Sequence, residues 1–495
     1  MVVTCAQMKE TEEALFATGV PADPLMELAG LGCVRAIRQL FPTPGHAILF
    51  VGKGHNAGDA YVIGRHLRRA GWEVAERLAH SPSDLAPLTA RKRHRFLQTP
   101  GSPAEPISPA PLVAIDGLLG IGASGPLRGA FAALAREMET LRSQSGACVI
   151  ALDIPSGLDG DSGIPHPGAV RADVTLTIAC VKQGLLADSA LDHVGRLILI
   201  PVPQIQPSTG NSNLVTLHAL GLAPLLPPPP FSQHKISAGR VGLIAGSAAY
   251  SGAPVLSSLG ALRAGGGLIH LFCPRPVHPL IAPRCPPEVI LRPFDHLGEI
   301  HDVPLDALGI GPGLSGIDDA EMLAFLQTDP RPLVLDAEAL NTLARHDALP
   351  RLAGAPASRL LTPHPGEMRR LVPSLDASLS RVEVARSFVA SHTFTLLFKG
   401  SRTIIAERNR PVSFNTTGHP GMATGGVGDV LTGILAAFLA RGIPAYDAAC
   451  LGSWLIGHAA ELFLAGGSCA PEGLAASEIA QHLPKAIAGL RRGVF

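Results

Sequence analysis

Residues 421–433 combine several glycines with one acidic side chain, and they lead directly into an apolar helical stretch at 430–440. Glycines allow backbone N–H groups to turn toward a phosphate, and the N-terminus of the following helix adds the positive end of its dipole. Asp429 stands where a carboxylate could take a proton from a substrate hydroxyl. The segment therefore indicates phosphoryl transfer, although a glycine-rich turn alone is also typical of an ordinary loop-to-helix junction.

Four further motifs precede this segment in the same half of the chain. They are Ile-Gly-Pro-Gly-Leu (310–314), Leu-Asp-Ala-Glu-Ala-Leu-Asn (335–341), Leu-Thr-Pro-His-Pro-Gly-Glu (361–367) and Lys-Gly-Ser-Arg-Thr (399–403). A Lys-Gly turn offers charge and free N–H groups to phosphates. His364 lies between two prolines on a stiff loop, where its ring could hydrogen-bond a ligand, although a lone histidine is more often structural.

The order of these motifs, from about residue 234 onward, resembles that of the nucleotide-dependent NAD(P)H-hydrate dehydratases, which are ribokinase-like enzymes. The resemblance implies that the ring hydroxyl of the S-form hydrate is phosphorylated and that phosphate then leaves, with Asp429 as the catalytic base. The backbone N–H groups of 425–428 would stabilise the moving phosphoryl group. Val427 departs from the family, which commonly has threonine there, so one hydrogen bond to the nucleotide would be missing.

The same resemblance implies two sets of ligand-binding residues. The hydrated dinucleotide would contact Ala253, Gly313, His364 and Asp429. An adenine nucleotide, ADP or ATP with magnesium, would be bound by Lys399, Gly400, Ser401, Arg402, Thr403 and Gly428.

In the first half, three apolar runs each end in polar residues. The run 47–51 is followed by Gly-Lys-Gly-His-Asn-Ala-Gly-Asp (52–59), and two later runs end in Asp116 and Asp153. Because the carboxyl ends of parallel strands meet at one edge of a sheet, we expect these side chains around one crevice. Such oxygen ligands suit a hard cation beside an acid/base carboxylate, although each aspartate could also cap a helix or a turn.

Residues 1–215 resemble the NAD(P)H-hydrate epimerases, with Met-Glu-Leu-Ala-Gly (26–30), Asp-Ile-Pro-Ser-Gly (153–157) and Thr175 among the matching positions. The resemblance implies that Asn56, Asp116 and Ser156 bind potassium. Asp153 would be the proton-shuttling acid/base, with Lys182 as its assistant. The hydrated nucleotide would be held by His55, Asn56, Ala57, Gly58, Asp59, Gly120, Ile121, Gly122, Ala123, Ser124, Gly125, Pro126 and Asp153.

Three residues of the first loop depart from this family. His55 stands where asparagine is common, and Ala57 and Ala60 replace glycines. An added methyl group restricts positive φ and close backbone approach, so we expect the departures to weaken binding. Gly58 and Asp59 keep the family pattern.

A chain of 495 residues is too long for one ordinary core and predicts two to four domains. Short apolar runs alternate with longer Ala/Leu/Arg stretches, which is typical of parallel βαβ units. We expect two three-layer αβα domains, a Rossmann-like domain at 1–215 and a ribokinase-like domain at 233–495, joined by a proline-rich linker at 216–232. The predicted strands are 47–51, 113–115, 148–152, 174–178, 197–200, 241–245, 268–272, 333–335, 395–398 and 403–405.

Composition narrows the class of partner. Forty basic and forty acidic residues cancel, so bulk charge favours neither nucleic acid nor an anionic membrane. Eight scattered cysteines without a CxxC pair predict neither a disulfide framework nor a zinc site. The apolar stretch 446–465 contains charged residues and is not expected to span a bilayer. We expect a cytoplasmic enzyme, a homo-oligomer, with small-molecule ligands only.

Other interpretations remain open at this point. The glycine-rich segment would also serve a ribokinase-like kinase acting on a sugar or a hydroxymethylpyrimidine, fused to a non-catalytic Rossmann-like domain. The first domain could alternatively bind RNA, but 4% aromatic residues and the presence of both aspartates argue against it. Segments 81–111 and 203–213 are predicted as surface loops, and the cations at 91–95 as a solvated helix face or a phosphate-binding patch.

Overall fold

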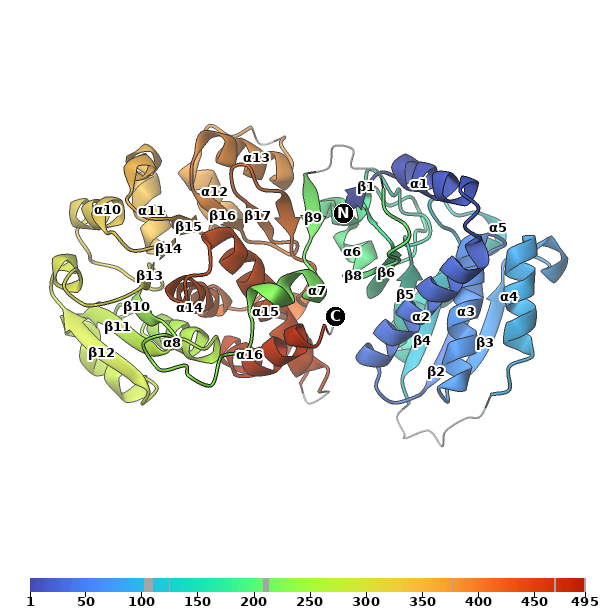
Figure 1. The fold of residues 1–495 in the computed structure, drawn as a ribbon, viewed down its shortest axis with the longest axis horizontal. Helices are drawn as coiled ribbons and strands as arrows, with labels where there is room; N and C mark the ends of the chain where they lie inside the picture. The colour runs from blue at the N-terminus through green and yellow to red at the C-terminus, as the bar shows by residue number, and fades with distance from the viewer. Residues whose placement is uncertain (102–109, 124, 208–212, 377, 467–468, 494–495) are drawn as a thin grey trace. The chain divides into compact units, whose positions relative to one another are not determined.

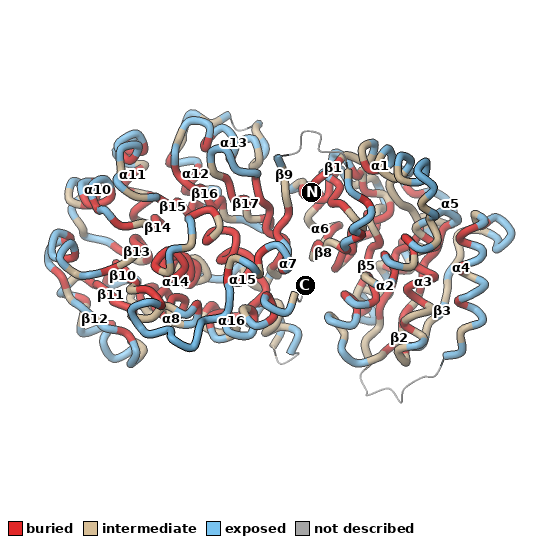
Figure 2. The backbone as a smooth tube through the Cα atoms, in the orientation of Figure 1, coloured by how far each residue is buried: buried red, intermediate tan, exposed pale blue. Residues whose placement is uncertain are grey.

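The computed structural model describes the whole chain except residues 102–109, 124, 208–212, 377, 467–468 and 494–495. Within the described residues, the contacts divide the protein into two compact units, Met1–Ser212 and Asn213–Val494. Each unit has its own large sheet (Figure 1). The strands of both sheets are mostly buried (Figure 2).

The first unit is built on a six-stranded sheet in which every neighbouring pair is parallel. In spatial order its strands are β3 (Glu73–Leu78), β2 (His46–Val51), β4 (Leu112–Gly117), β5 (Cys148–Leu152), β6 (Val174–Ile178) and β8 (Arg196–Ile200). A separate parallel pair joins β1 (Val2–Val3) to β7 (Val181–Lys182). Parallel pairing brings the carboxyl ends of β2, β4 and β5 to one edge.

Alternation of side chains along these strands makes two apolar layers. Leu49 and Ile115 belong to a buried cluster that includes side chains of α2 (Ala22–Leu40) and α3 (His55–Arg69). Their chain neighbours Phe50 and Ala114 belong to a different cluster, which includes α5 (Gly129–Ser145). Successive residues of a strand point to opposite faces, so helices cover both sides of the sheet. The three-layer αβα architecture is confirmed for this unit.

The second unit contains a ten-stranded sheet. Its strands are parallel from one edge through β16, β17 is antiparallel to both of its neighbours, and β9 pairs in parallel with β18. In spatial order they are β12 (Val289–Phe294), β11 (Leu268–Pro274), β10 (Arg240–Ile244), β13 (Ala307–Ile310), β14 (Leu333–Leu335), β15 (Arg359–Leu361), β16 (Thr395–Phe398), β17 (Ile404–Ala406), β18 (Val412–Phe414) and β9 (Leu214–Thr216).

Helices cover the central strands of this sheet. Every residue of β14 and β16 is buried, as expected for strands covered on both faces. The principal helices are α8 (Ala253–Arg263), α10 (Asp319–Thr328), α11 (Glu338–Arg345), α12 (Pro365–Leu371), α13 (Arg381–Ser391), α14 (Val427–Ala440), α15 (Ala445–Leu464) and α16 (Ala476–Arg491).

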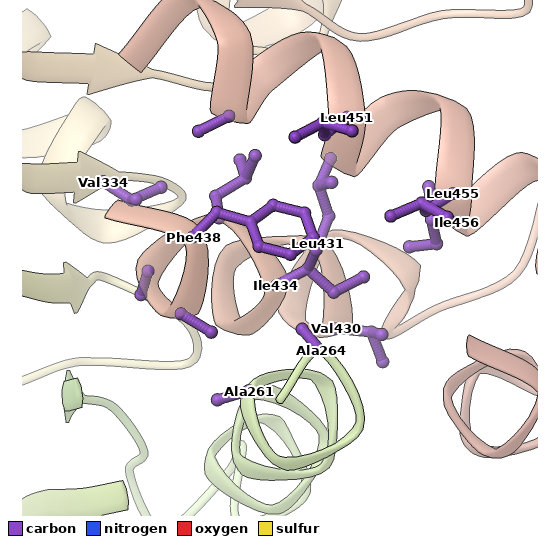
Figure 3. Packing of buried hydrophobic residues seen from close by; sticks show 14 of the residues in the cluster. Ala261, Ala264, Val334, Val430, Leu431, Ile434, Phe438, Leu451, Leu455 and Ile456 are labelled. Carbon is purple, nitrogen blue, oxygen red and sulfur yellow. The ribbon is translucent and has the colours of Figure 1, made fainter. Parts of the chain in front are cut away.

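Helix α14 is the apolar centre of the second unit. Every residue from Val430 to Ala440 is buried, and Ile434 and Phe438 lie among side chains of α8, α15 and β14 (Figure 3). Where α14 crosses α8, a Cβ at Gly433 would lie 1.9 Å from the carbonyl oxygen of Ser257, and one at Gly260 would lie 2.2 Å from that of Val430. Only glycine permits this approach, which fixes the position of the first turn of α14.

The proline-rich segment differs from the predicted linker. Strand β9 extends the sheet beside β18, and Leu217, Leu222 and Leu226 are buried in the core of the second unit. The boundary between the units falls between Ser212 and Asn213, and 213–226 belongs to the second unit. The proline run terminates this packed segment because it cannot continue a helix, and residues 227–237 are exposed.

Part of the predicted loop 81–111 is helix α4 (Pro87–Leu97). Its Lys92 is 1% exposed and forms ion pairs of 2.8 Å with Asp23 and 2.6 Å with Glu27, while Arg93 pairs with Glu76 at 2.5 Å. These cations are therefore committed to neighbouring acids instead of forming a free phosphate-binding patch. No helix in the described part of the chain combines the length and apolarity needed to cross a membrane.

Candidate active sites

The segment 55–59 forms the first turns of α3, which begins after Gly54. The Asn56 amide donates through Nδ2 to the carbonyl of Leu119 at 2.7 Å and to that of Leu152 at 3.2 Å. These carbonyls follow β4 and end β5, so one side chain joins the carboxyl ends of three strands. Its amide oxygen accepts no hydrogen bond from the described residues.

Asp116 and Ser156 form a buried network beside Asn56. The Ser156 hydroxyl donates to Oδ1 of Asp116 at 2.7 Å, its backbone N–H donates to Oδ2 at 2.8 Å, and Leu119 N–H donates to the Ser156 hydroxyl at 3.0 Å. Burial raises the pKa of Asp116 to about 6, while the hydrogen bonds from Ser156 and Leu118 counteract part of that rise. The arrangement is an oxygen-rich cluster around the 117–119 turn.

Asp153 occupies a strained backbone position at the end of β5. Its φ is +66°, in the left-handed region, where its N–H bonds the carbonyl of Leu176 at 2.8 Å. Its Oδ1 accepts hydrogen bonds from Ile178 N–H at 3.0 Å and from the ammonium of Lys182, which is fully buried. Asp153 and the proposed assistant Lys182 are therefore in direct contact.

Two more acids surround this pair. Removal from water raises the pKa of Asp59 well above its ordinary value, and the charges of Asp153 and Glu12 raise it further. Glu12, on α1 (Cys5–Ala17), likewise has its pKa raised by burial and then by Asp153. The sequence interpretation missed Glu12, because α1 carries no motif; its position one turn after the buried Met8 was the only available signal.

The turn 120–126 lies beside Asn56, since a Cβ at Gly120 would be 3.6 Å from Cβ of Asn56. At Gly122 and Gly125 an added Cβ would meet no atom within 4 Å, so this part of the turn borders open space. Ile121 packs partly against the apolar cluster that contains Met8. The predicted contact Ser124 lies outside the described residues.

The two alanines that replace family glycines require no unusual backbone. Ala57 and Ala60 lie inside α3, are 0% exposed and are not among the residues with positive φ. The expectation that their methyl groups strain the loop is wrong in this respect, because the segment is helical. His55 is exposed at the helix start.

Asp429 lies in the first turn of α14, after Gly426, whose φ of +93° lets the chain turn into the helix. Burial raises the pKa of Asp429 to about 7; the charge of Asp336 also raises it, and Lys399 lowers it. No described residue donates a hydrogen bond to its carboxylate. Asp429 is thus a base that can be deprotonated near neutral pH.

The turn 399–403 follows β16 and is held by a residue that the sequence analysis did not identify. Arg381, at the start of α13, donates through Nη2 to the carbonyls of Phe398, Lys399 and Arg402 at 3.2, 3.2 and 3.1 Å. Gly400 and Ser401 are exposed, Thr403 donates to the Gly400 carbonyl at 3.1 Å, and Arg402 is buried. The buried Arg402 side chain is less suited to a ligand contact than the rest of the turn.

Asp336, immediately after β14, connects this turn to α14. Its Oδ1 accepts from Nζ of Lys399 at 2.7 Å, and its Oδ2 accepts from the Thr432 hydroxyl at 3.0 Å. Lys399 also lies 3.6 Å from Oε2 of Glu367. A Cβ at Gly428 would be 3.6 Å from both Oδ2 of Asp336 and Nζ of Lys399, so Gly428, Lys399 and Asp429 share one site.

His364, Gly313 and Ala253 are the remaining residues predicted to contact the hydrate. His364 begins α12, accepts hydrogen bonds from Gly366 and Glu367 N–H on Nδ1, and is half exposed. A Cβ at Gly313 would lie 2.8 Å from Cβ of Ala253 and 2.7 Å from Cβ of Tyr250, so Ala253 and Gly313 are adjacent. Tyr250 is 63% exposed.

Comparisons with known proteins cover both units. Residues 22–184 match the family described as YjeF-related protein N-terminus, and residues 241–485 match NAD(P)H-hydrate dehydratase. The chain is 35% identical over 462 residues to a bifunctional NAD(P)H-hydrate repair enzyme of Gloeobacter violaceus, covering 89% of each chain. It is 34% identical over 499 residues to that of Moorella thermoacetica, covering 93% of this chain and 92% of the relative. A crystal structure of a ribokinase-like superfamily protein from Enterococcus faecalis V583 matches with a TM-score of 0.50 at 26% identity, over 58% of this chain and 99% of that one.

Proposed function

The chain belongs to the family of bifunctional NAD(P)H-hydrate repair enzymes, and on that premise we propose that it repairs hydrated NADH and NADPH with two sites. The first unit interconverts the R and S hydrates, and the second dehydrates the S form with ADP or ATP. The observation that carries the proposal is Asp429, a carboxylate with its pKa raised to about 7 in the first turn of α14 and in the same site as Lys399. That is the geometry expected for a base in phosphoryl transfer.

In the second unit, Asp429 takes the proton of the ring hydroxyl while that oxygen attacks the terminal phosphoryl group of the nucleotide. The bond between that phosphoryl group and the nucleotide breaks, leaving a shortened nucleotide and a phosphate ester on the ring. Phosphate then departs with the electrons of the ring carbon–oxygen bond, and the neighbouring ring carbon loses a proton to restore the double bond. The N–H groups of 425–428, at the positive end of α14, stabilise the transferring phosphoryl charge.

The residues present fit a nucleotide with magnesium. Around Gly425 no atom would lie within 4 Å of an added Cβ, so the glycine turn borders space for phosphates, and Lys399 brings a positive charge to the same site. Both carboxylates that flank Lys399 are engaged with it, so magnesium would be held mainly by nucleotide oxygens. It would supply charge neutralisation for the transferring group. The turn Lys399, Gly400, Ser401 and Thr403 would hold the nucleotide with Gly428, and Ala253, Gly313 and His364 would contact the hydrate.

In the first unit, Asp153 would take the proton of the ring hydroxyl and pass it to the ring nitrogen as the bond between that nitrogen and the hydroxyl-bearing carbon breaks. The reverse steps would close the ring on the other face and so change the configuration of that carbon. Lys182 donates a hydrogen bond to Asp153 and so fixes the position of its carboxylate. The first turns of α3 and the turn 120–126 would bind the nucleotide, since a helix N-terminus favours phosphate.

A potassium ion fits the oxygen cluster of this unit. Among the described residues no group donates a hydrogen bond to the amide oxygen of Asn56, and Asp116 and Ser156 are joined at 2.7 Å, so an amide, a carboxylate and a hydroxyl lie around one backbone turn. Hard cations prefer such oxygens. Potassium would supply positive charge for the phosphates of the substrate.

The test is recovery of the reduced ring. Purified chain with ADP or ATP and magnesium should convert both hydrates of NADH to NADH, seen as the return of the absorbance of the reduced nicotinamide. Potassium should accelerate consumption of the R form more than that of the S form. A chain that ignores the hydrates and instead phosphorylates a sugar or a pyrimidine alcohol would contradict the proposal.

A further inference from the structure

The second unit contains a buried carboxylate that the proposed mechanism does not use. Asp336 is 3% exposed and accepts two hydrogen bonds from side chains far apart in the sequence, Lys399 at 2.7 Å and Thr432 at 3.0 Å. Lys399 belongs to the turn that follows β16, and Thr432 lies on α14, three residues after Asp429. Residues three apart lie on the same side of a helix, so Asp336 contacts the side of α14 that carries the base.

We propose that Asp336 is a positioning residue of the phosphoryl-transfer site, which holds Lys399 by a direct hydrogen bond and so leaves the carboxylate of Asp429 free to accept the substrate proton. This inference rests on the proposed dehydratase activity of the second unit. Asp336 would hold Lys399 in this way before the substrate binds.

The geometry places three charges within one small volume. A Cβ at Gly428, the residue before Asp429, would be 3.6 Å from Oδ2 of Asp336 and 3.6 Å from Nζ of Lys399. If Lys399 were free, it would turn toward Asp429 and stabilise the deprotonated form. The 2.7 Å contact with Asp336 commits the ammonium to a different carboxylate.

The charges that face this group come from several elements. Asp336 follows β14, Lys399 follows β16, and Glu367 on α12 lies 3.6 Å from Nζ of Lys399. His364, at the start of α12, lies 3.6 Å from Glu367 and is half exposed. Among the described residues, Asp336 and Lys399 are the charged groups that act directly on Asp429.

These charges have opposite effects on the base and on the lysine. Burial raises the pKa of Asp429 to about 7, with Asp336 adding to the rise and Lys399 opposing it. Burial lowers the pKa of Lys399, but Asp336 and Glu367 outweigh that effect and leave it raised. Lys399 therefore stays charged while Asp429 titrates near neutrality.

The experiment is a pH profile of dehydration of the S hydrate, with Asp336→Asn as the principal variant. The deprotonated base is the active form, so the wild-type rate should rise with pH through about 7. Removing the charge of Asp336 lowers the pKa of Asp429, and the freed Lys399 lowers it further. The rising limb should therefore move to lower pH by about 1 unit or more.

Two further variants separate charge from packing. Thr432→Val removes one hydrogen bond but keeps the carboxylate of Asp336. It should therefore lower kcat by about 2- to 10-fold and leave the pH of the rising limb unchanged. Glu338→Gln changes a neighbouring acid that pairs with Arg345, and it should leave both rate and limb unchanged. A merely structural Asp336 would lower the rate of Asp336→Asn without moving its limb.

A titration that needs no substrate completes the test. The carboxyl ¹³C signal of Asp429, assigned by its loss in Asp429→Asn, should titrate near pH 7 in the wild type and at lower pH in Asp336→Asn. Coincident limbs in wild type and Asp336→Asn would overturn the inference. If Asp336→Asn does not fold, a wild-type Asp429 that titrates near pH 4 would overturn it. A wild type that titrates as expected but does not dehydrate the hydrate would instead overturn the proposed function.

Discussion

The two units place aspartates at the carboxyl edge of a parallel sheet, but they surround them differently. In the first unit, Asp116 accepts three hydrogen bonds and Asp153 is in contact with the ammonium of Lys182. In the second unit, no described residue donates a hydrogen bond to the carboxylate of Asp429. The ammonium of Lys399, which lies beside it, is hydrogen-bonded to Asp336. In the proposed function, the same side chain would serve as a ligand, as one half of a proton-exchanging pair, or as an open base, according to its partners.

Asp429→Asn should produce the largest difference between the units. Dehydration of the S hydrate should fall by about 10³-fold or more, because general-base removal typically costs about 10²–10⁴ and the neighbouring carboxylate of Asp336 is engaged with Lys399 and Thr432. Interconversion of R and S, followed by NMR of the hydrates, should continue at the wild-type rate. The exposed Asp302→Asn is the matched control, and retained dehydration in Asp429→Asn would show that another group is the base.

Asp153→Asn should have the converse effect, somewhat smaller. Epimerisation should fall by about 10²-fold, since Lys182 remains in place and can carry part of the proton exchange. With an equal mixture of the two hydrate epimers, half of the substrate should then be consumed at the normal rate and the R form should remain. Asp84→Asn, on an exposed turn of the same unit, should change neither activity. Slower consumption of pure S hydrate would contradict independent sites.

Asp429 should also reduce the stability of the second unit in a pH-dependent way. Its folded pKa of about 7 lies above the ordinary value of an aspartate, so the folded protein loses stability once pH exceeds about 4, and the loss is complete above about 7. The full difference would correspond to about 4 kcal/mol, and solvent screening reduces this to about 2 kcal/mol. Urea unfolding should show Asp429→Asn to be more stable than wild type at pH 8.

At pH 4 that difference should vanish, because the carboxyl is then protonated in the folded state. Equal stability of the two proteins at pH 8 would show that Asp429 is not desolvated, and would weaken the contrast between the units.

Val427→Thr should have the smallest effect. Position 427 begins α14, where a hydroxyl could donate to a nucleotide oxygen, and one neutral hydrogen bond contributes about 0.5–1.5 kcal/mol. The nucleotide KM should therefore fall by about 2- to 10-fold, with epimerisation unchanged. An unchanged KM would mean that the hydroxyl does not face the nucleotide.

Much of the architecture could be predicted, since all ten predicted strands are present and their ends lie within two residues of the predicted ones. These strands are short runs of consecutive apolar residues buried on both faces. Among the missed strands, β13 and β15 are also fully buried but are only four and three residues long, whereas β3 and β12 lack that pattern. Strand β3 alternates exposed and half-buried residues at an edge, and β12 contains Pro293 at the other sheet's edge.

The boundary between the units was harder to predict. A proline-rich composition indicates where the chain cannot form a helix or strand, but it does not indicate which residues pack into a core. The proline run at 227–230 is the most conspicuous break in the sequence, yet Leu217, Leu222 and Leu226 just before it are core residues. Three leucines separated by loop formers carry no helical or strand period. Their burial depends on β18, which lies nearly two hundred residues later in the chain.

The sequence by itself determined the motifs, their order and therefore the family, because glycines, prolines and acids at strand ends are local requirements of turns and helix starts. Only the tertiary structure decided which charges meet. Asp336, Lys399 and Thr432 are brought together by parallel pairing of strands β14 to β16 and by the close crossing of α8 and α14. A pKa depends on distances between side chains remote in sequence, and those distances exist only once the sheet has formed.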